Sequence, residues 1–209
     1  MTEYEIKVKK HEQLNALAQK GQIVFAGSSL MEDFPIAEMA QALPERPVVY
    51  NRGIGGDTLD GFARRLGSAV LDLVPRLLFL NIGTNDMGLP GYSAEALVRK
   101  YRAVLETIRE RVFGIEIVVM SYYPVNRAVC PDPEWLGART NAEIARLNAL
   151  LAAMAAQMGL SYVDVSSCLM DERGELRAEL AVDGVHMYPA AYARVLEMLA
   201  PYVVKRFNT

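Results

Sequence analysis

The stretch RLLFLNIGTND, residues 76–86, decides the fold. An unbroken apolar run from Leu77 to Leu80 leads directly into asparagine, glycine, threonine and aspartate. Continuous apolar runs of this length are typical of parallel strands that are covered on both faces. Polar residues that follow such a strand lie at its carboxyl end, where open α/β sheets bind their ligands. The stretch therefore predicts a buried parallel strand that leads into a functional site.

Similar strand candidates alternate along the chain with helical patterns. Apolar residues in the helical segments recur at spacings of three and four, and Gly21, Gly114 and Gly159 stand where three of these helices should end. Expected strands are residues 22–26, 47–51, 76–82, 115–121 and 161–165, and expected helices include 5–19, 93–113, 140–158 and 189–207. The one long irregular segment is expected at 122–139.

This alternation predicts an α/β fold. Five parallel strands would form a doubly wound sheet between two layers of helices, which is a three-layer α/β/α sandwich. No linker, internal repeat or low-complexity tract interrupts the pattern, so we expect a single domain over residues 1–209. This length is ordinary for one domain.

The composition argues against several classes of function. The 22 basic and 25 acidic residues give a net charge of −3, which offers no basic surface for nucleic acid. The apolar runs are too short to span a bilayer, and the N-terminus lacks the order of a signal peptide. The two cysteines, Cys130 and Cys168, are too few for a disulfide framework and lack metal-type spacing. We therefore expect a cytoplasmic protein without a membrane span, a metal or a cofactor.

Motifs that carry chemistry follow the predicted strands. They are Gly27-Ser28-Ser29-Leu30, Gly53-Ile54-Gly55-Gly56-Asp57-Thr58, Gly83-Thr84-Asn85-Asp86 and, before the last helix, Asp183-Gly184-Val185-His186. A hydroxyl, an imidazole and a carboxylate are the parts of a nucleophilic acyl-transfer site. The glycine and asparagine motifs can supply hydrogen-bond donors to an oxyanion. Because the carboxyl ends of parallel strands meet at one edge, we expect these motifs to converge there.

The motifs resemble, in order and spacing, the four sequence blocks of the SGNH (GDSL-type) hydrolases, a family of esterases and lipase/acylhydrolase enzymes with a flavodoxin-like sheet. The resemblance covers nearly the whole chain. It implies that Ser29 is the nucleophile, His186 the general base and Asp183 the residue that orients the imidazole. It also implies an oxyanion hole formed by the backbone N–H groups of Ser29 and Gly56 and the side-chain amide of Asn85.

One position departs from the family pattern. Ser28 stands where the first block usually has an aspartate, which leaves two adjacent serines. The flanking glycine and leucine align Ser29 with the nucleophile. The usual aspartate is not the triad acid, so its replacement leaves the mechanism possible but bears on the local turn and on the reactivity of Ser29.

Several residues of the chain have simpler interpretations. Gly53-x-Gly55 lacks the third glycine of a dinucleotide-binding loop, because Thr58 stands in its place. Asp57 and Asp60 have no partners at metal-ligand spacing. His11, the other histidine, lies among Lys and Glu and is expected on the surface. Candidates for a substrate pocket are Met87, Tyr122, Tyr123, Val125 and Trp135, although each of them could equally serve ordinary packing.

The function that follows is hydrolysis of a small-molecule ester through a serine acyl-enzyme, with short acyl groups favoured. Alternatives are a carbohydrate O-acetyl esterase, and an enzyme like the lysophospholipases, thioesterases or platelet-activating-factor acetylhydrolases of the family. A silent binding protein on the same fold is the alternative outside enzymes. The sequence does not define the oligomeric state, although the N-terminal helix could pack on a partner and form a homo-oligomer.

Overall fold

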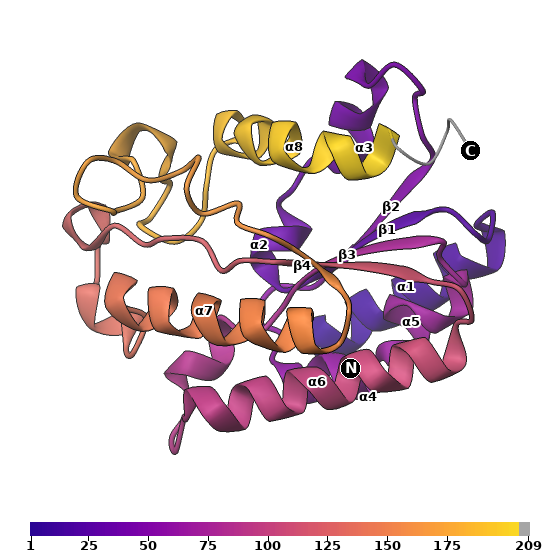
Figure 1. Ribbon diagram of the computed structural model, residues 1–209, viewed down its shortest axis with the longest axis horizontal. Coiled ribbons are helices and arrows are strands. Elements are labelled where there is room, and N and C mark those ends of the chain that lie inside the picture. Colours follow the sequence, from indigo (N-terminus) through magenta and orange to yellow (C-terminus); the bar gives the residue numbers. More distant parts are fainter. Residues whose placement is uncertain (205–209) are drawn as a thin grey trace.

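The computed structural model describes residues 1–204 and contains a five-stranded parallel sheet (Figure 1). Its strand order is β2-β1-β3-β4-β5, the order of doubly wound, flavodoxin-like sheets. The strands are β1 (Ile23–Gly27), β2 (Val49–Gly53), β3 (Leu77–Asn81), β4 (Glu116–Met120) and β5 (Ser161–Val163). The predicted α/β fold with a parallel doubly wound sheet is confirmed.

Helices cover both faces of this sheet. They are α1 (Glu3–Leu17), α2 (Ser29–Glu32), α3 (Ile36–Met39), α4 (Leu59–Arg64), α5 (Leu66–Ala69), α6 (Ala94–Arg111), α7 (Asn141–Gln157) and α8 (Pro189–Val204). Short 3-10 turns are η1 (Ala40–Ala42), η2 (Leu71–Leu73), η3 (Asn85–Gly88), η4 (Arg127–Val129), η5 (Pro133–Leu136) and η6 (Ala178–Leu180). In Figure 1, α3 and α8 lie on one side of the sheet, and α1, α5, α6 and α7 on the other.

The core consists of the strand side chains and the helix faces packed on them. All five residues of β1 and all five of β3 are buried, as expected for central strands covered on both faces. Phe25 of β1 stacks on Phe79 of β3 with ring centroids 4.5 Å apart, and it meets the edge of Phe34 at 5.4 Å. Phe34 in turn stacks on Tyr192 of α8, so aromatic contacts join this helix to the sheet.

The register of the strands places the ends of β1, β2 and β3, and the motifs that follow them, at the same edge of the sheet. Gly27 at the end of β1 pairs with both Gly53 of β2 and Asn81 of β3. The chain leaves β1 toward β2 and then returns to the other side of β1 as β3. The connections after β1 and β3 therefore diverge at this point, which in doubly wound sheets is where ligands bind.

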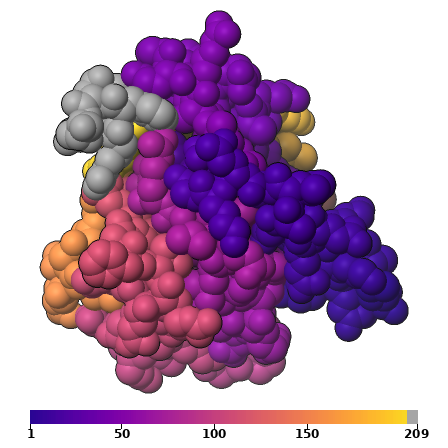
Figure 2. Space-filling model, turned by 90° about the vertical axis from the view of Figure 1, so that its right-hand side faces the viewer, coloured from indigo at the N-terminus to yellow at the C-terminus, as the bar shows by residue number. Residues whose placement is uncertain are grey.

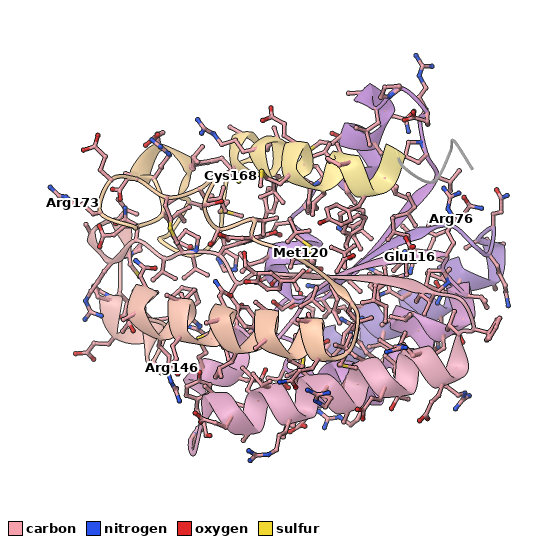
Figure 3. The ribbon with its side chains drawn as sticks, in the orientation of Figure 1. Arg76, Glu116, Met120, Arg146, Cys168 and Arg173 are labelled. Carbon is pink, nitrogen blue, oxygen red and sulfur yellow. The ribbon has the colours of Figure 1, made fainter. Side chains whose placement is uncertain are left out.

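Most predicted boundaries lie within a few residues of the observed ones. The two long helices begin at serine and threonine caps, Ser93 and Thr140, whose hydroxyls accept N–H groups of their first turns. Arg146 of α7, labelled in Figure 3, pairs with Glu95 of α6 and so joins these helices. The predicted end of the last helix at residue 207 lies outside the described residues.

One expectation about the loops was wrong. Residues 122–139 are irregular as predicted, apart from η4 and η5, but they are not the only long irregular segment. Residues 164–188 contain only η6 and two isolated antiparallel bridges. Among residues 1–204, no helix is long and apolar enough to cross a membrane.

Candidate active site

Ser29 lies at the first position of α2, and Ser28 alone separates it from the end of β1. The strand reaches this turn through Gly27, where a Cβ atom would lie only 1.9 Å from the carbonyl oxygen of Asn81 in β3. Only glycine permits this close approach of the two strands. The first amide of a helix lacks an intrahelical acceptor, so the N–H group of Ser29 is available to a ligand at the same place as its hydroxyl.

The turn before α8 presents the imidazole of His186. The Oδ1 atom of Asp183 accepts the backbone N–H groups of Val185 at 3.0 Å and His186 at 2.7 Å. The carbonyl oxygen of Gly184 accepts the N–H group of Asn126, which lies in the 122–139 loop. The turn is therefore fixed both internally and against its neighbour.

A continuous chain of hydrogen bonds joins the three predicted catalytic side chains. His186 Nε2 lies 2.8 Å from Ser29 Oγ, and His186 Nδ1 lies 2.7 Å from Asp183 Oδ2. Although burial acts to raise the pKa of Asp183, the hydrogen bonds from the ring and backbone of His186 and from Val185 outweigh it and lower that pKa. The carboxylate is thus held ionised beside the imidazole, the arrangement in which a histidine can take a proton from a serine.

The second block forms a tight turn after β2. Gly56 has a φ of +76°, in the left-handed region that favours glycine, and no atom lies within 4 Å of the place where its Cβ would be. The neighbouring Gly55 donates its N–H group to Glu32 Oε2 at 2.6 Å, and a Cβ on Gly55 would lie 3.8 Å from Ser29 Cβ. The turn of Gly55 and Gly56 therefore lies beside Ser29.

Asn85 begins η3 after β3, and its side-chain amide is held at both ends. Its Nδ2 donates to the carbonyl oxygen of Asp57 in the second block at 2.9 Å, and its Oδ1 lies 3.4 Å from Arg139 Nη2. A primary amide has two N–H groups, so one of them remains for a ligand. The third block is in this way joined directly to the second.

Three acidic or basic residues near Ser29 were not singled out in the sequence. Asp33 follows α2, and its pKa is raised by burial although His186 acts to lower it. Glu32 forms an ion pair with Lys7 of α1 at 2.9 Å while it accepts the N–H group of Gly55. The sequence could have indicated these residues only through the two acidic residues, Glu32 and Asp33, that follow the serine motif. Ordinary surface charges give the same pattern.

The five candidates for a substrate pocket lie in two different environments. Met87, Tyr122, Tyr123 and Val125 are buried, with exposures between 1% and 4%. Trp135 of η5 is 47% exposed, and its ring centroid lies 6.0 Å from that of His186. Trp135 also lines a cavity of about 230 Å³ together with Cys130, Pro131, Asp132 and Asp183. Of the five, Trp135 is the residue that the structure places beside the histidine.

The placement of His11 was predicted wrongly. Its ring is partly buried where α1 packs on the body of the protein, and its Nδ1 is enclosed without a recorded hydrogen-bond partner. Burial, followed by the charges of Arg52, Arg65 and Lys7, lowers its pKa to about 4. The sequence did not indicate this contact because α1 packs on the rest of the protein through polar groups, so its buried face has no apolar pattern.

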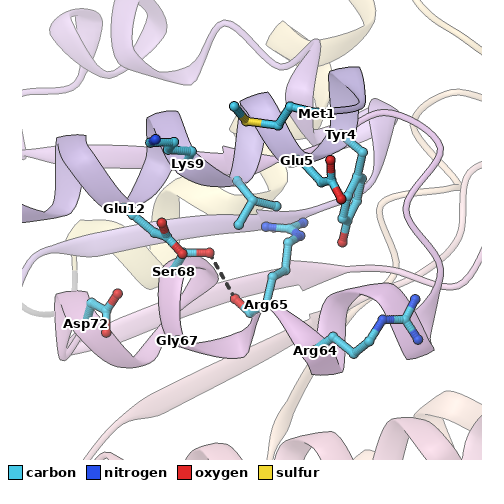
Figure 4. A pocket seen from close by; sticks show the side chains of 11 residues that line it. Met1, Tyr4, Glu5, Lys9, Glu12, Arg64, Arg65, Gly67, Ser68 and Asp72 are labelled. Atoms are coloured by element: carbon cyan, nitrogen blue, oxygen red, sulfur yellow. Dashed lines mark hydrogen bonds between the residues drawn. The ribbon is translucent and has the colours of Figure 1, made fainter.

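A separate groove of about 560 Å³ lies between α1 and the segment from α4 to η2 (Figure 4). It is lined by acidic and basic side chains alike, and its described lining contains no residue of the four sequence blocks. Arg65, labelled in Figure 4, reaches from this groove into the protein and pairs with Asp57 at 2.6 Å. Its other nitrogens donate to the carbonyl oxygens of Arg52 and Gly27.

A doubly wound sheet with a serine, a histidine and an aspartate at its carboxyl edge defines a class of α/β hydrolytic enzymes. A sequence model of the GDSL-like lipase/acylhydrolase family matches residues 25–194, and the chain belongs to that family. It is therefore a hydrolase that acts on ester bonds.

Similar proteins agree with this assignment. Platelet-activating factor acetylhydrolase IB subunit alpha1 from Pongo abelii is 26% identical over 180 residues, which are 85% of this chain and 73% of the relative. A Streptococcus pneumonia structure provisionally described as a platelet activating factor is 27% identical, with a TM-score of 0.86 over 96% of this chain and 92% of the other. A GDSL-like lipase from Bacteroides thetaiotaomicron, at 22% identity, shares the fold with a TM-score of 0.79 over 95% of this chain and 97% of its own.

Proposed function

We propose that this protein is a serine esterase in which Ser29 is the nucleophile, His186 the general base and Asp183 the orienting acid. The observation that carries the proposal is the unbroken chain from Ser29 Oγ through both ring nitrogens of His186 to Asp183, with bonds of 2.8 and 2.7 Å. A serine hydroxyl is a poor nucleophile until an adjacent base accepts its proton, and this geometry provides that base.

The reaction would proceed in two halves. Ser29 Oγ attacks the ester carbonyl carbon while its proton passes to His186 Nε2, and the carbonyl oxygen becomes an oxyanion. The carbon–oxygen bond to the alcohol then breaks, and the alcohol leaves with the proton from His186. Water, deprotonated by the same imidazole, attacks the acyl-serine, releases the carboxylic acid and restores the hydroxyl.

The oxyanion would be bound by the N–H groups of Ser29 and Gly56 and by the remaining amide N–H of Asn85. These donors come from three loops at the carboxyl ends of adjacent strands, so the sheet fixes their relative positions before substrate binds. Such preorganised donors stabilise developing charge without reorganisation, and losing one typically lowers kcat on the order of 100-fold or more.

We propose short acyl esters, acetyl esters above all, as substrates. The cavity lined by Trp135 and Asp183 does not include Ser29 in its lining, but it adjoins the histidine, and its volume of about 230 Å³ is below the usual range for drug-sized ligands. The names of similar proteins, an acetylhydrolase of platelet-activating factor and an acetylxylan esterase from Geobacillus stearothermophilus, point to the same acyl group. We also propose a cytoplasmic location and a single domain over residues 1–209.

Carbohydrate O-acetyl groups are a second candidate substrate, favoured by the exposed ring of Trp135 beside His186. A flat, amphipathic ring at the mouth of the site can pack against a sugar while the acetyl group reaches the serine. Acetate release from acetylated xylo-oligosaccharides, measured against release from p-nitrophenyl acetate, separates this candidate from a general short-chain esterase.

The nucleophile is tested by intact-mass spectrometry after treatment with a fluorophosphonate, followed by mapping of the adduct. We expect one adduct, on Ser29, and none in the Ser29→Ala variant. The absence of an adduct in folded parent protein would refute the proposed serine mechanism. An adduct on Ser28 would shift the assignment by one residue.

A further inference from the structure

Arg139 stands out as a buried guanidinium at the rim of the candidate active site. It lies at the end of the 122–139 loop, directly before Thr140, the cap of α7, and is 7% exposed. The ion pairs recorded for residues 1–204 give it no carboxylate partner, in contrast to Arg65, which pairs with Asp57. A buried cation without a counter-ion is costly, and such a cost is typical of positions with a functional role.

Arg139 contacts the segment that contains Asn85 of the predicted oxyanion hole. Its Nε donates to the carbonyl oxygen of Thr84 at 3.1 Å, and its Nη2 lies 3.4 Å from Asn85 Oδ1. A Cβ on Gly88, at the end of η3, would lie 3.4 Å from Nη2, so the guanidinium packs closely on this turn. The arginine therefore contacts the segment 84–88 from its first residue to its last.

Arg139 also organises Trp135. Its Nη1 donates to the carbonyl oxygen of Trp135 at 2.9 Å, and its guanidinium carbon lies 5.2 Å from the centroid of the indole ring. This contact replaces part of the hydration that the cation loses by burial. Burial nevertheless lowers the pKa of Arg139, which remains charged because the ordinary pKa of arginine is so high.

We infer that Arg139 is a positioning residue of the oxyanion hole, which fixes and polarises the side-chain amide of Asn85. This inference rests on the proposed function. The guanidinium attracts electron density toward Asn85 Oδ1, which makes the opposite N–H group a stronger donor. The carbonyl oxygen of Asp57 holds the other N–H group at 2.9 Å, so the free N–H can point in only one direction.

The net charge of Arg139 adds to this effect. As the substrate carbonyl becomes an oxyanion, negative charge develops next to Asn85, and an uncompensated cation behind the amide stabilises it. In a partly dehydrated site this attraction is much stronger than in water. Arg139 therefore contributes more in the transition state than in the ground state, which lowers the barrier rather than tightening substrate binding.

The test compares Arg139→Gln, which keeps a donor but removes the charge, with Arg139→Lys, which keeps the charge. With p-nitrophenyl acetate, we expect Arg139→Gln to lower kcat by about tenfold or more with little change in KM, because the lost stabilisation belongs to the transition state. Arg139→Lys should retain more of kcat than Arg139→Gln. Arg127→Gln, which removes an exposed arginine from the same loop, is the matched control and should leave both constants unchanged.

A double-mutant cycle with Asn85→Ala separates this role from a merely structural one. If Arg139 acts largely through Asn85, Arg139→Gln should lower kcat by a clearly smaller factor in the Asn85→Ala background than in the parent, and the remaining loss reports the direct attraction between the cation and the oxyanion. An unchanged kcat in Arg139→Gln, or the same loss in both backgrounds, would overturn the inference. Fluorophosphonate labelling of the parent protein distinguishes failure of this inference from failure of the proposed function. A parent protein that neither reacts with the fluorophosphonate nor hydrolyses the ester would overturn the proposed function as well.

Discussion

Two adjacent serines occupy the turn after β1, and only one of them contacts the histidine. Ser29 Oγ lies 2.8 Å from His186 Nε2, whereas the Oγ atom of Ser28 is buried without a recorded hydrogen-bond partner. The difference follows from the backbone, because Ser28 still belongs to the extended turn and Ser29 is already the first residue of α2. Neighbouring side chains at such a junction point in different directions.

We therefore predict opposite results for two alanine variants. Ser29→Ala should abolish hydrolysis of p-nitrophenyl acetate, while Ser28→Ala should keep kcat/KM within roughly threefold of the parent, because its hydroxyl makes no bond that is lost. The same argument predicts that Ser28→Ala is no less stable than the parent. Steady-state kinetics and thermal unfolding of both purified variants check this, and a Ser28→Ala protein that folds but is inactive would contradict it.

The sequence predicted which three side chains, those of Ser29, His186 and Asp183, meet in one chain of hydrogen bonds, but not the residues that surround them. Ser29, Asp183 and His186 could be found because few residue types perform this chemistry and because their positions relative to the strands are regular. Arg139 and Arg65 donate mainly to backbone carbonyl oxygens, which every residue possesses. Such partners leave no pattern in a single sequence, so only the folded structure identifies these arginines.

Among the elements, α1 shows why periodicity failed to identify a buried face. Its contacts with the body are polar: Asn15 donates to the carbonyl oxygen of Ser68 and accepts from Arg52 Nε, and Tyr4 donates to Asp57. Apolar residues such as Leu14 and Leu17 are instead exposed on this helix, which extends beyond the neighbouring surface in Figure 2. The positions of the apolar residues in α1 therefore do not indicate which face of this helix packs on the protein.

The buried histidine of α1 leads to a prediction about stability and pH. The pKa of His11 is about 4 in the folded protein and near its ordinary 6.5 in the unfolded chain, so the unfolded chain binds an extra proton between these values. The stability that comes from neutral His11 is complete above pH 6.5 and is lost as the pH falls toward 4. The difference between the two pKa values corresponds to about 3 kcal/mol, and solvent screening of the partly exposed ring reduces this contribution to about 2 kcal/mol.

A non-titrating replacement isolates this contribution. His11→Gln should lose less stability than the parent between pH 6.5 and 4, because the carboxylates that titrate at lower pH are common to both proteins. Urea unfolding at a series of pH values measures the free energy of unfolding of each. Parallel curves for the parent and His11→Gln would show that His11 titrates equally in the folded and unfolded states.

At the scale of the whole molecule, Arg65 joins several of the segments that build the site. Its side chain is 2% exposed, and it bonds to the carboxylate of Asp57, the carbonyl oxygen of Gly27 at the end of β1 and that of Arg52 in β2. The carbonyl oxygen of Asp57 in turn accepts the amide of Asn85 after β3. The carboxyl ends of β1, β2 and β3 are therefore connected through polar contacts as well as through the sheet.

Removing one partner of this buried pair should destabilise the protein strongly. We expect Arg65→Met to lower the free energy of unfolding by about 3–5 kcal/mol, because Asp57 is left as an uncompensated buried charge. Replacing both partners, in Arg65→Met with Asp57→Leu, should restore part of the loss, since a buried pair gains little over apolar groups of similar size. The carbonyl oxygens of Gly27 and Arg52 lose the guanidinium N–H groups in both variants, although Gly27 still accepts the N–H group of Ile54, so recovery should be incomplete.

An exposed pair provides the matched control for this prediction. Lys100 and Asp60 also lie 2.6 Å apart, but their side chains are 51% and 54% exposed. Lys100→Met should therefore cost less than about 1 kcal/mol, because water solvates the remaining carboxylate. Urea unfolding of the parent and of the three variants (Arg65→Met, Arg65→Met with Asp57→Leu, and Lys100→Met) measures the free energy of unfolding of each. If Arg65→Met proved as mild as Lys100→Met, the contacts of Arg65 would be dispensable, and the sheet alone would hold the three loops in register.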